Sequence, residues 1–220
     1  MTLWLTRIVP DTRSREARRD MGDPIGTHRR IMSLFPSEAG PDPRARFGVL
    51  FRTEDTPAGP HLLVQSTHEP DTNQLPDGYG TTLTRPLDAL IDAIRPGLTI
   101  RYRCAASPVR KPGATTRALY NLPPVVALTG TAADEWWLRQ ADNSGIKPLT
   151  HHSHPLDTVR GQRRPDSAPA QNIRHARTQF DGTAAIIDTD LLRAAVLNGI
   201  GRGKAYGCGL LSIAPARQTP

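Results

Sequence analysis

Five glycines alternate with cations near the end of the chain, in the segment GIGRGKAYGCGLLSIAP at residues 199–215. Glycine adopts positive-φ conformations without steric cost and leaves its backbone N–H groups uncovered. Successive N–H groups in such turns form concavities that bind anions, and Arg202 and Lys204 stand beside them. The pattern predicts a phosphate-binding loop, with Gly199, Gly201, Gly203 and Gly207 among its contacts. A glycine-rich turn of purely structural use is the alternative.

The loop does not match the two common nucleotide-binding patterns. Those loops open a helix, whereas this one follows a predicted helix at residues 188–198 and precedes a short apolar strand at residues 210–213. Asn198 and Gly199 form a favourable helix C-cap pair. The predicted order is therefore helix, basic glycine-rich loop, closing strand.

His28 is the second group suited to chemistry. It lies in the segment DPIGTHRRIMSLFP, where Asp23 can cap a helix that has Pro24 at its first position. Imidazole titrates near neutral pH and transfers protons readily. Arg29 and Arg30 follow it, and the helix N-terminus favours an anion nearby. A lone histidine is also commonly an ordinary surface side chain, and that alternative stays open.

Charge is segregated along a chain whose formal net charge is +7. Residues 99–133 carry five basic side chains and no acidic one, whereas residues 54–96 carry seven acidic side chains against two arginines. This pattern favours a polyanionic partner. The cations expected to bind it are Arg15, Arg18 and Arg19 of a first helix, Lys111 and Arg117 of a basic loop, and Arg160, Arg163 and Arg164 of an arginine-rich turn.

The predicted elements follow one order twice. Residues 98–104, 131–145, 146–181 and 188–213 predict strand, helix, two strands, helix and strand, which is the ferredoxin-like order. Residues 3–94 begin in the same way, as strand, helix, two strands and a short helix at 87–94, which follows the poorly patterned stretch 69–86, and the last strand is unclear. We expect an α+β protein with two tandem ferredoxin-like domains, residues 1–96 and 97–220. Cys104 and Cys208 are expected as reduced, buried thiols on neighbouring strands.

Three histidines in a row of four residues, His151, His152 and His154, raise a metal site as a rival. One strand sends His152 and His154 to the same face but His151 to the other, and no cysteine lies nearby. We therefore expect no metal and no cofactor. There is no long apolar run or signal peptide, so no membrane association and a cytoplasmic location are expected.

The opening LWLTRIVPDTRSREARRDMGDPIGTHRRIMSLFP and the ending GIGRGKAYGCGLLSIAP together resemble the CasE family of CRISPR repeat-processing endoribonucleases of the Cascade type. The resemblance implies a tandem ferredoxin-like protein that binds the hairpin of a CRISPR repeat transcript. It also implies one cut at the 3′ base of the hairpin, without metal, and retention of the product with the other Cascade subunits. The family's catalytic histidine corresponds to His28. Some relatives have a tyrosine three positions earlier, where this chain has Ile25.

Metal-free RNA cleavage can proceed by attack of a ribose 2′-hydroxyl on phosphorus, and His28 suits either proton transfer in that reaction. Arg29 and Arg30 could orient the phosphate. The competing function is a non-catalytic module that binds hairpin RNA. A sheet that stacks single-stranded bases usually presents several aromatic residues, whereas the strand LTIRYRC offers Tyr102 alone, which favours shape and backbone recognition in either case.

Overall fold

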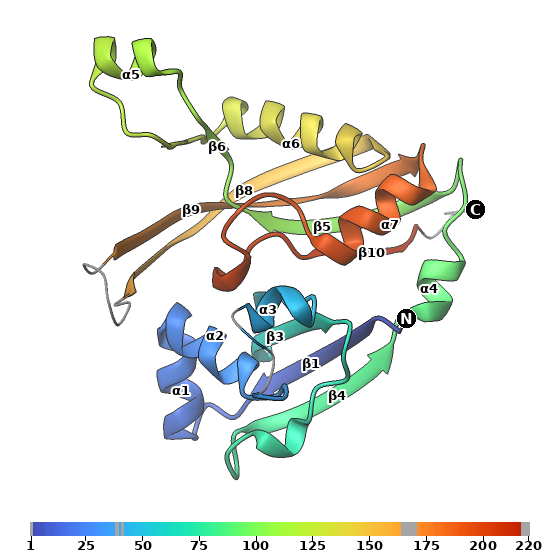
Figure 1. The fold of residues 1–220 in the computed structure, drawn as a ribbon. Coiled ribbons are helices and arrows are strands. Elements are labelled where there is room, and N and C mark those ends of the chain that lie inside the picture. The colour runs from blue at the N-terminus through green and yellow to red at the C-terminus, as the bar shows by residue number, and fades with distance from the viewer. Residues whose placement is uncertain (1, 38–39, 41, 164–170, 217–220) are drawn as a thin grey trace.

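The computed structural model describes residues 2–37, 40, 42–163 and 171–216, and it contains two four-stranded antiparallel sheets (Figure 1). The first sheet has the order β2-β3-β1-β4, and the second has the order β10-β5-β9-β8. Each sheet places its first strand in the centre, between its third and its last strand. This is the strand order of a ferredoxin-like fold, so the predicted fold class is confirmed for both halves.

The first half comprises β1 (Trp4–Pro10), α1 (Arg15–Gly22), α2 (Pro24–Met32), α3 (Pro43–Arg46), β2 (Leu50–Thr56), β3 (Gly59–Ser66), the 3₁₀ turn η1 (Thr72–Gln74) and β4 (Gly80–Pro86). The helices α1 and α2 pack on one face of this sheet. The buried core between them includes Ile31 of α2, Ile8 of β1 and Phe51 of β2. The capping signals were predicted correctly. Ser14 accepts a hydrogen bond from the Ala17 N–H, and Asp23 accepts from the N–H groups of Ile25 and Gly26.

One expectation for the first half is wrong. The stretch without a clear pattern contains β4, which pairs along its whole length with β1, and the short helix α4 (Asp88–Asp92) follows this strand instead of preceding it. A 3₁₀ turn stands where a second packed helix would be. In and just before α4, Leu87, Leu90 and Ile91 pack against the core of the second half. The domain boundary near residue 96 stays a prediction, and α4 joins the two sheets.

The second half comprises β5 (Thr99–Ala106), β6 (Val109–Arg110), α5 (Ala114–Tyr120), β7 (Val126–Ala127), α6 (Thr131–Asn143), β8 (Ile146–Arg163), β9 (Gln171–Ile186), α7 (Thr189–Asn198), the 3₁₀ turn η2 (Lys204–Tyr206) and β10 (Leu211–Pro215). Trp137 stacks on Phe180 with ring centroids 4.9 Å apart, and its indole N–H donates to the Tyr102 hydroxyl at 3.4 Å. These contacts fix α6 on the sheet.

The expected basic loop after β5 is partly regular. It holds the small β6–β7 ladder and α5, which stands away from both sheets (Figure 1). The closing strand β10 pairs antiparallel with β5, as predicted, and places Leu211 opposite Cys104. The expectation that Cys208 lies on this strand is wrong, because Cys208 stands three residues before Leu211, in the loop that precedes β10. Both thiols are free and buried, and burial raises the pKa of each to about 12.

Candidate functional site

His28 and the glycine-rich loop share one pocket. A hollow of ≈ 540 Å³ is lined by residues of three segments: Ile25 and His28 of α2, Asp42, Pro43 and Arg44 at the start of α3, and Ala205 and Tyr206 of η2. The 3₁₀ turn η2 contacts both α2 and β2. The prediction that His28 lies on a helix facing a cleft between the two halves, within reach of the loop, is therefore confirmed.

Local sequence explains where His28 points. Asp23 ends α1 and caps α2, accepting hydrogen bonds of 3.0 Å from Ile25 N–H and Gly26 N–H. Thr27 and Ile31 of α2 are buried, Ile31 in the first core, whereas His28 is partly exposed and lines the pocket together with Tyr206 of the second half. Its ring lies 6.4 Å from that of Phe51 on β2. The side chain is half-buried at the rim of the core and available to the pocket.

All five loop glycines have positive φ, from +70° at Gly199 to +90° at Gly209. Two of them also sit against backbone. A Cβ on Gly199 would lie 2.8 Å from the Gly209 carbonyl oxygen, and a Cβ on Gly209 would lie 2.7 Å from that of Ile200. The loop conformation therefore requires glycine at these positions. The expected conformational role of the glycines is confirmed, while their contact with RNA stays a prediction.

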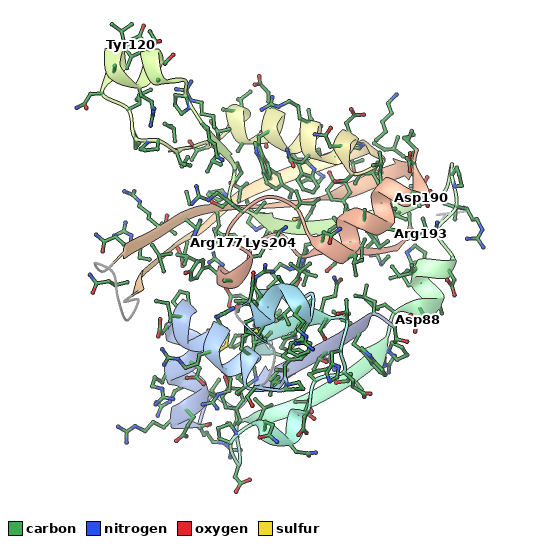
Figure 2. The ribbon with its side chains drawn as sticks, viewed as in Figure 1. Asp88, Tyr120, Arg177, Asp190, Arg193 and Lys204 are labelled. Carbon is green, nitrogen blue, oxygen red and sulfur yellow. The ribbon has the colours of Figure 1, made fainter. Side chains whose placement is uncertain are left out.

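Positive charge gathers around the loop. Lys204 of η2 is half-buried, and its burial, with Arg44 nearby, lowers the pKa of its ammonium group. Arg177 of β9 reaches towards Gly207, where a Cβ would be 4.0 Å from its Nη1. Figure 2 shows Arg177 and Lys204 together between the two halves. An anion entering here would relieve the repulsion between these cations.

The other cations that the sequence singled out lie in several places. Arg15, Arg18 and Arg19 are exposed on α1, Arg29 is exposed on α2, and Arg202 is exposed in the loop. Arg160 is exposed on β8, which contacts α2 through Ile25 and Gly161. Arg163 is the last residue of β8, and Arg164 lies outside the described residues. In Figure 1 the helices α1 and α2 and the hairpin end of β8–β9 lie on one side of the molecule.

Two predicted groups are placed less favourably. Lys111 and Arg117 belong to the segment between β6 and β7 that stands away from α1 and α2 (Figure 1). Arg30 is held by Asp20 at 2.7 Å and lies over the Tyr79 ring, 5.4 Å from its centroid. Its environment is that of a structural ion pair. An RNA-binding role for these three residues stays a prediction.

The three clustered histidines do not converge. The ring of His151 contacts residues at the edge of the second core. Its Nε2 lies 3.1 Å from the Asp134 carboxylate, its Nδ1 lies 3.3 Å from the Tyr102 hydroxyl, and the ring stacks on Phe180. His152 and His154 are exposed. The arrangement gives His151 a structural role at the junction of α6 and β8.

Sequence reasoning missed two aromatic residues of the site. Tyr206 lines the pocket, and His175 of β9 stacks on it with ring centroids 5.2 Å apart. The position of Tyr206 between two loop glycines was an available signal. His175 lies in a stretch that was interpreted only as a strand after an arginine-rich turn, and nothing in its neighbourhood along the chain marks it.

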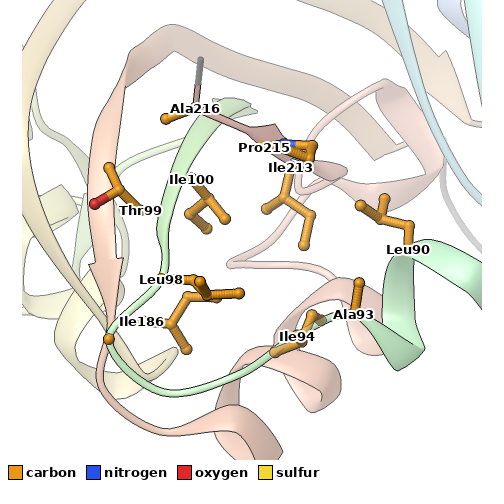
Figure 3. A pocket seen from close by; sticks show the side chains of 11 residues that line it. Leu90, Ala93, Ile94, Leu98, Thr99, Ile100, Ile186, Ile213, Pro215 and Ala216 are labelled. Carbon is orange, nitrogen blue, oxygen red and sulfur yellow. The ribbon is translucent and has the colours of Figure 1, made fainter. Parts of the chain in front are cut away.

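A second hollow has different chemistry. It measures ≈ 470 Å³ and is lined by Leu90, Ile94 and Ile100 with other apolar side chains of α4, β5 and β10 (Figure 3). No side chain that lines it carries a group for proton transfer. The pocket of His28 is thus the better candidate for catalysis. None of the helices in the described residues is long and apolar enough to cross a membrane.

Comparison with known proteins identifies the family of this chain. The family described as "CRISPR associated protein" matches residues 3–215. The CRISPR-associated endoribonuclease Cse3 of Thermus thermophilus is 32% identical over 97% of this chain and 100% of the relative. The Cascade subunit CasE of Escherichia coli is 26% identical over 86% and 90% of the two chains. A structure of Cse3 bound to 19-nucleotide RNA superposes with a TM-score of 0.79 at 29% identity, covering 98% of this chain and 100% of that one. The chain therefore belongs to the CasE/Cse3 family of CRISPR repeat-processing endoribonucleases.

Proposed function

We propose that this chain binds the hairpin of a CRISPR repeat transcript and cleaves it once per repeat by attack of a ribose 2′-hydroxyl on the adjacent phosphorus. The observation that carries the proposal is the pocket shared by His28 and η2 of the glycine-rich loop. It places a group for proton transfer opposite a basic loop suited to phosphate. The relatives named as endoribonucleases support the same activity.

The reaction forms a bond from the 2′-oxygen to phosphorus and breaks the bond from phosphorus to the 5′-oxygen. A base removes the 2′-hydroxyl proton, and an acid protonates the departing 5′-oxygen. His28 performs one of these transfers. Lys204 and Arg44 supply positive charge at the phosphate as negative charge develops on it. His28 thus supplies one proton transfer, solvent water supplies the other, and the two cations supply charge, so we propose that cleavage needs no metal ion.

The exposed cations on the same side of the molecule would hold the hairpin. Arg15, Arg18 and Arg19 of α1, Arg29 of α2, Arg160 of β8 and Arg202 of the loop are exposed and suited to phosphate contacts. The duplex would lie against α1, α2 and the β8–β9 hairpin, with its 3′ base at the pocket. We also propose that the product stays bound after cleavage and that the chain remains with other Cascade subunits in the cytoplasm. The name of the Escherichia coli relative, a Cascade subunit, supports the association with Cascade.

The test is His28→Ala, assayed with the repeat RNA under single-turnover conditions in excess chelator. We expect wild-type cleavage to persist without divalent metal, and the variant to bind the hairpin normally but to cut it about 10²–10⁴-fold more slowly, because one acid or base is lost. A 2′-deoxy substitution before the cut should abolish cleavage, since it removes the nucleophile.

His61→Ala is the matched control, because His61 lies on β3 outside the pocket. Loss of wild-type cleavage in chelator would refute metal independence. Cleavage by His28→Ala at the wild-type rate would move the catalytic role elsewhere. Binding without any cutting, with or without Mg²⁺, would favour the non-catalytic hairpin-binding module.

A further inference from the structure

Tyr206 presents a hydroxyl-bearing ring in the pocket of His28. On the α2 side, Ile25 adds only an apolar surface one turn before His28. On the α3 side, the carboxylate of Asp42 already accepts the Ala45 N–H at 3.2 Å and would repel a phosphate. The side chains of the pocket that can donate a hydrogen bond to an RNA phosphate are thus His28, Arg44 and Tyr206.

We propose that the Tyr206 hydroxyl donates a hydrogen bond to the phosphate at the cut, and that His175 is a positioning residue which holds the Tyr206 ring for this contact. The inference rests on the proposed cleavage of RNA in the His28 pocket. A phenol is neutral at physiological pH and keeps its proton, so it serves as a fixed donor to a charged acceptor.

His175 forms a platform behind Tyr206. Only 7% of it is exposed, and it lies on β9 opposite Val159, which is also buried. The two rings stack with an interplanar angle of 28°. Burial, and secondarily Arg202, lowers the pKa of His175, so the ring is neutral at neutral pH. Its Nδ1 is buried and has no hydrogen-bond partner among the described residues, while its ring packs on that of Tyr206.

The backbone on both sides of η2 limits the movement of Tyr206. Gly203 has φ +77° and Gly207 has φ +75°, and both lie against other residues. A Cβ on Gly203 would be 3.3 Å from the His175 Nδ1, and a Cβ on Gly207 would be 3.3 Å from the Phe51 ring. The turn that carries Tyr206 is therefore fitted between His175 on β9 and Phe51 on β2, and this fit sets the place of the hydroxyl.

Tyr206→Phe tests the proposal, since it removes the hydroxyl and keeps the ring on His175. We expect hairpin affinity within about 3-fold of wild type and single-turnover cleavage slower by roughly 10–100-fold, the effect of losing a hydrogen bond to a charged group. Tyr120→Phe, on the exposed end of α5, is the matched control and should cut like wild type.

The outcomes separate this proposal from the proposed function. If wild type cuts, His28→Ala is impaired and Tyr206→Phe cuts at the wild-type rate, the role of Tyr206 is refuted and RNA cleavage at His28 stands. If the wild-type protein does not cut the repeat, both the proposed cleavage activity and the role of Tyr206 in it are refuted. A slower cleavage rate in Tyr206→Phe but not in the control Tyr120→Phe, with unchanged RNA affinity, supports the hydrogen bond.

The role of His175 has its own signature, because it acts through the hydroxyl. As a single substitution, His175→Ala should slow cleavage about 10-fold. His175→Phe should lose less, because it keeps a ring under Tyr206. Added to Tyr206→Phe, His175→Ala should have no further effect on the rate. Equal slowing by His175→Ala in both backgrounds would refute positioning of the hydroxyl and would assign His175 a general structural role.

Discussion

Two adjacent arginines of α2 show how far environment separates identical residues. Arg29 is exposed, whereas the side chain of Arg30 is 18% exposed and its Nε donates to the Asp20 carboxylate at 2.7 Å. Asp20 is itself buried, and Tyr79 completes the group beneath Arg30. Burial, together with the Asp20 carboxylate, raises the pKa of Tyr79 to about 12, so this ring stays neutral. The pair Asp20–Arg30 joins α1 to α2.

Alanine substitutions of these two arginines should therefore affect different properties of the protein. Arg30→Ala leaves the buried Asp20 carboxylate with the neutral Tyr79 hydroxyl and the largely exposed Arg19, and it should lower the free energy of unfolding by about 3 kcal/mol. Arg29→Ala should change it by less than about 0.5 kcal/mol and weaken RNA binding instead. Urea unfolding and RNA titration of both variants measure the two quantities. An unchanged stability of Arg30→Ala would contradict the structural role of the ion pair.

The sequence predicted the candidate site only in part, because the environment of a side chain depends on residues far from it along the chain. His28 and the loop glycines stand out because their type and spacing have local meaning: a capped helix and positive φ. The partners of Arg30 are separated from it by 10 residues for Asp20 and by more for Tyr79, so that no local pattern connects them. The stacking of His175 on Tyr206 depends likewise on contact between β9 and the loop.

Among the elements, those with strong end signals were predicted well. Asp23, Pro24 and Ser14 mark the starts of α1 and α2, and Gly199 ends α7 with φ +70°. The strand β4 escaped prediction because it is an edge strand whose residues are mostly exposed, so it lacks the alternation of buried and exposed side chains that indicates a strand. It is defined by its pairing with β1, which the sequence of β4 does not encode by itself.

Comparing Gly209 of the glycine-rich loop with Gly97, which precedes β5, separates the cost of backbone strain from the cost of steric clash. Gly209 has φ +90°, and a Cβ there would lie 2.7 Å from the Ile200 carbonyl oxygen. Gly97 has φ +79° with nothing within 4 Å of its Cβ position. Gly97→Ala should therefore cost about 1 kcal/mol, from the left-handed conformation alone. Gly209→Ala should cost on the order of 3 kcal/mol, because the backbone must also move.

Thermal and urea unfolding of the two variants measure this difference, and cleavage assays measure its consequence for the site. Gly97→Ala should cut RNA like wild type, since Gly97 lies before β5 and away from the pocket. Gly209→Ala should cut more slowly as the loop shifts. Equal stability losses in the two variants would mean that the loop relaxes freely around a side chain at residue 209.

At the scale of the whole molecule, the site depends on how the two sheets are held together. Arg52 of β2 is 1% exposed and donates to the carbonyl oxygens of Leu210 at 3.0 Å and Arg103 at 3.3 Å, and to the Ser212 hydroxyl at 3.1 Å. Glu54 balances its charge at 2.6 Å. One arginine of the first sheet thus binds both β5 and the chain that leaves the glycine-rich loop.

Arg52→Met should consequently affect both folding and catalysis. The substitution keeps much of the volume but leaves two carbonyl oxygens, a hydroxyl and part of the Glu54 charge without their donor, so we expect a loss of about 3 kcal/mol in the free energy of unfolding. Arg101→Met, at an exposed position of β5, is the matched control and should change stability by less than about 0.5 kcal/mol. Because Leu210 directly follows the loop, we also expect slower cleavage at saturating RNA in the folded Arg52→Met protein, measured in single turnover at low temperature. If Arg52→Met lost stability but cut RNA at the wild-type rate, the contacts of Arg52 would stabilise the fold without setting the distance between His28 and the loop.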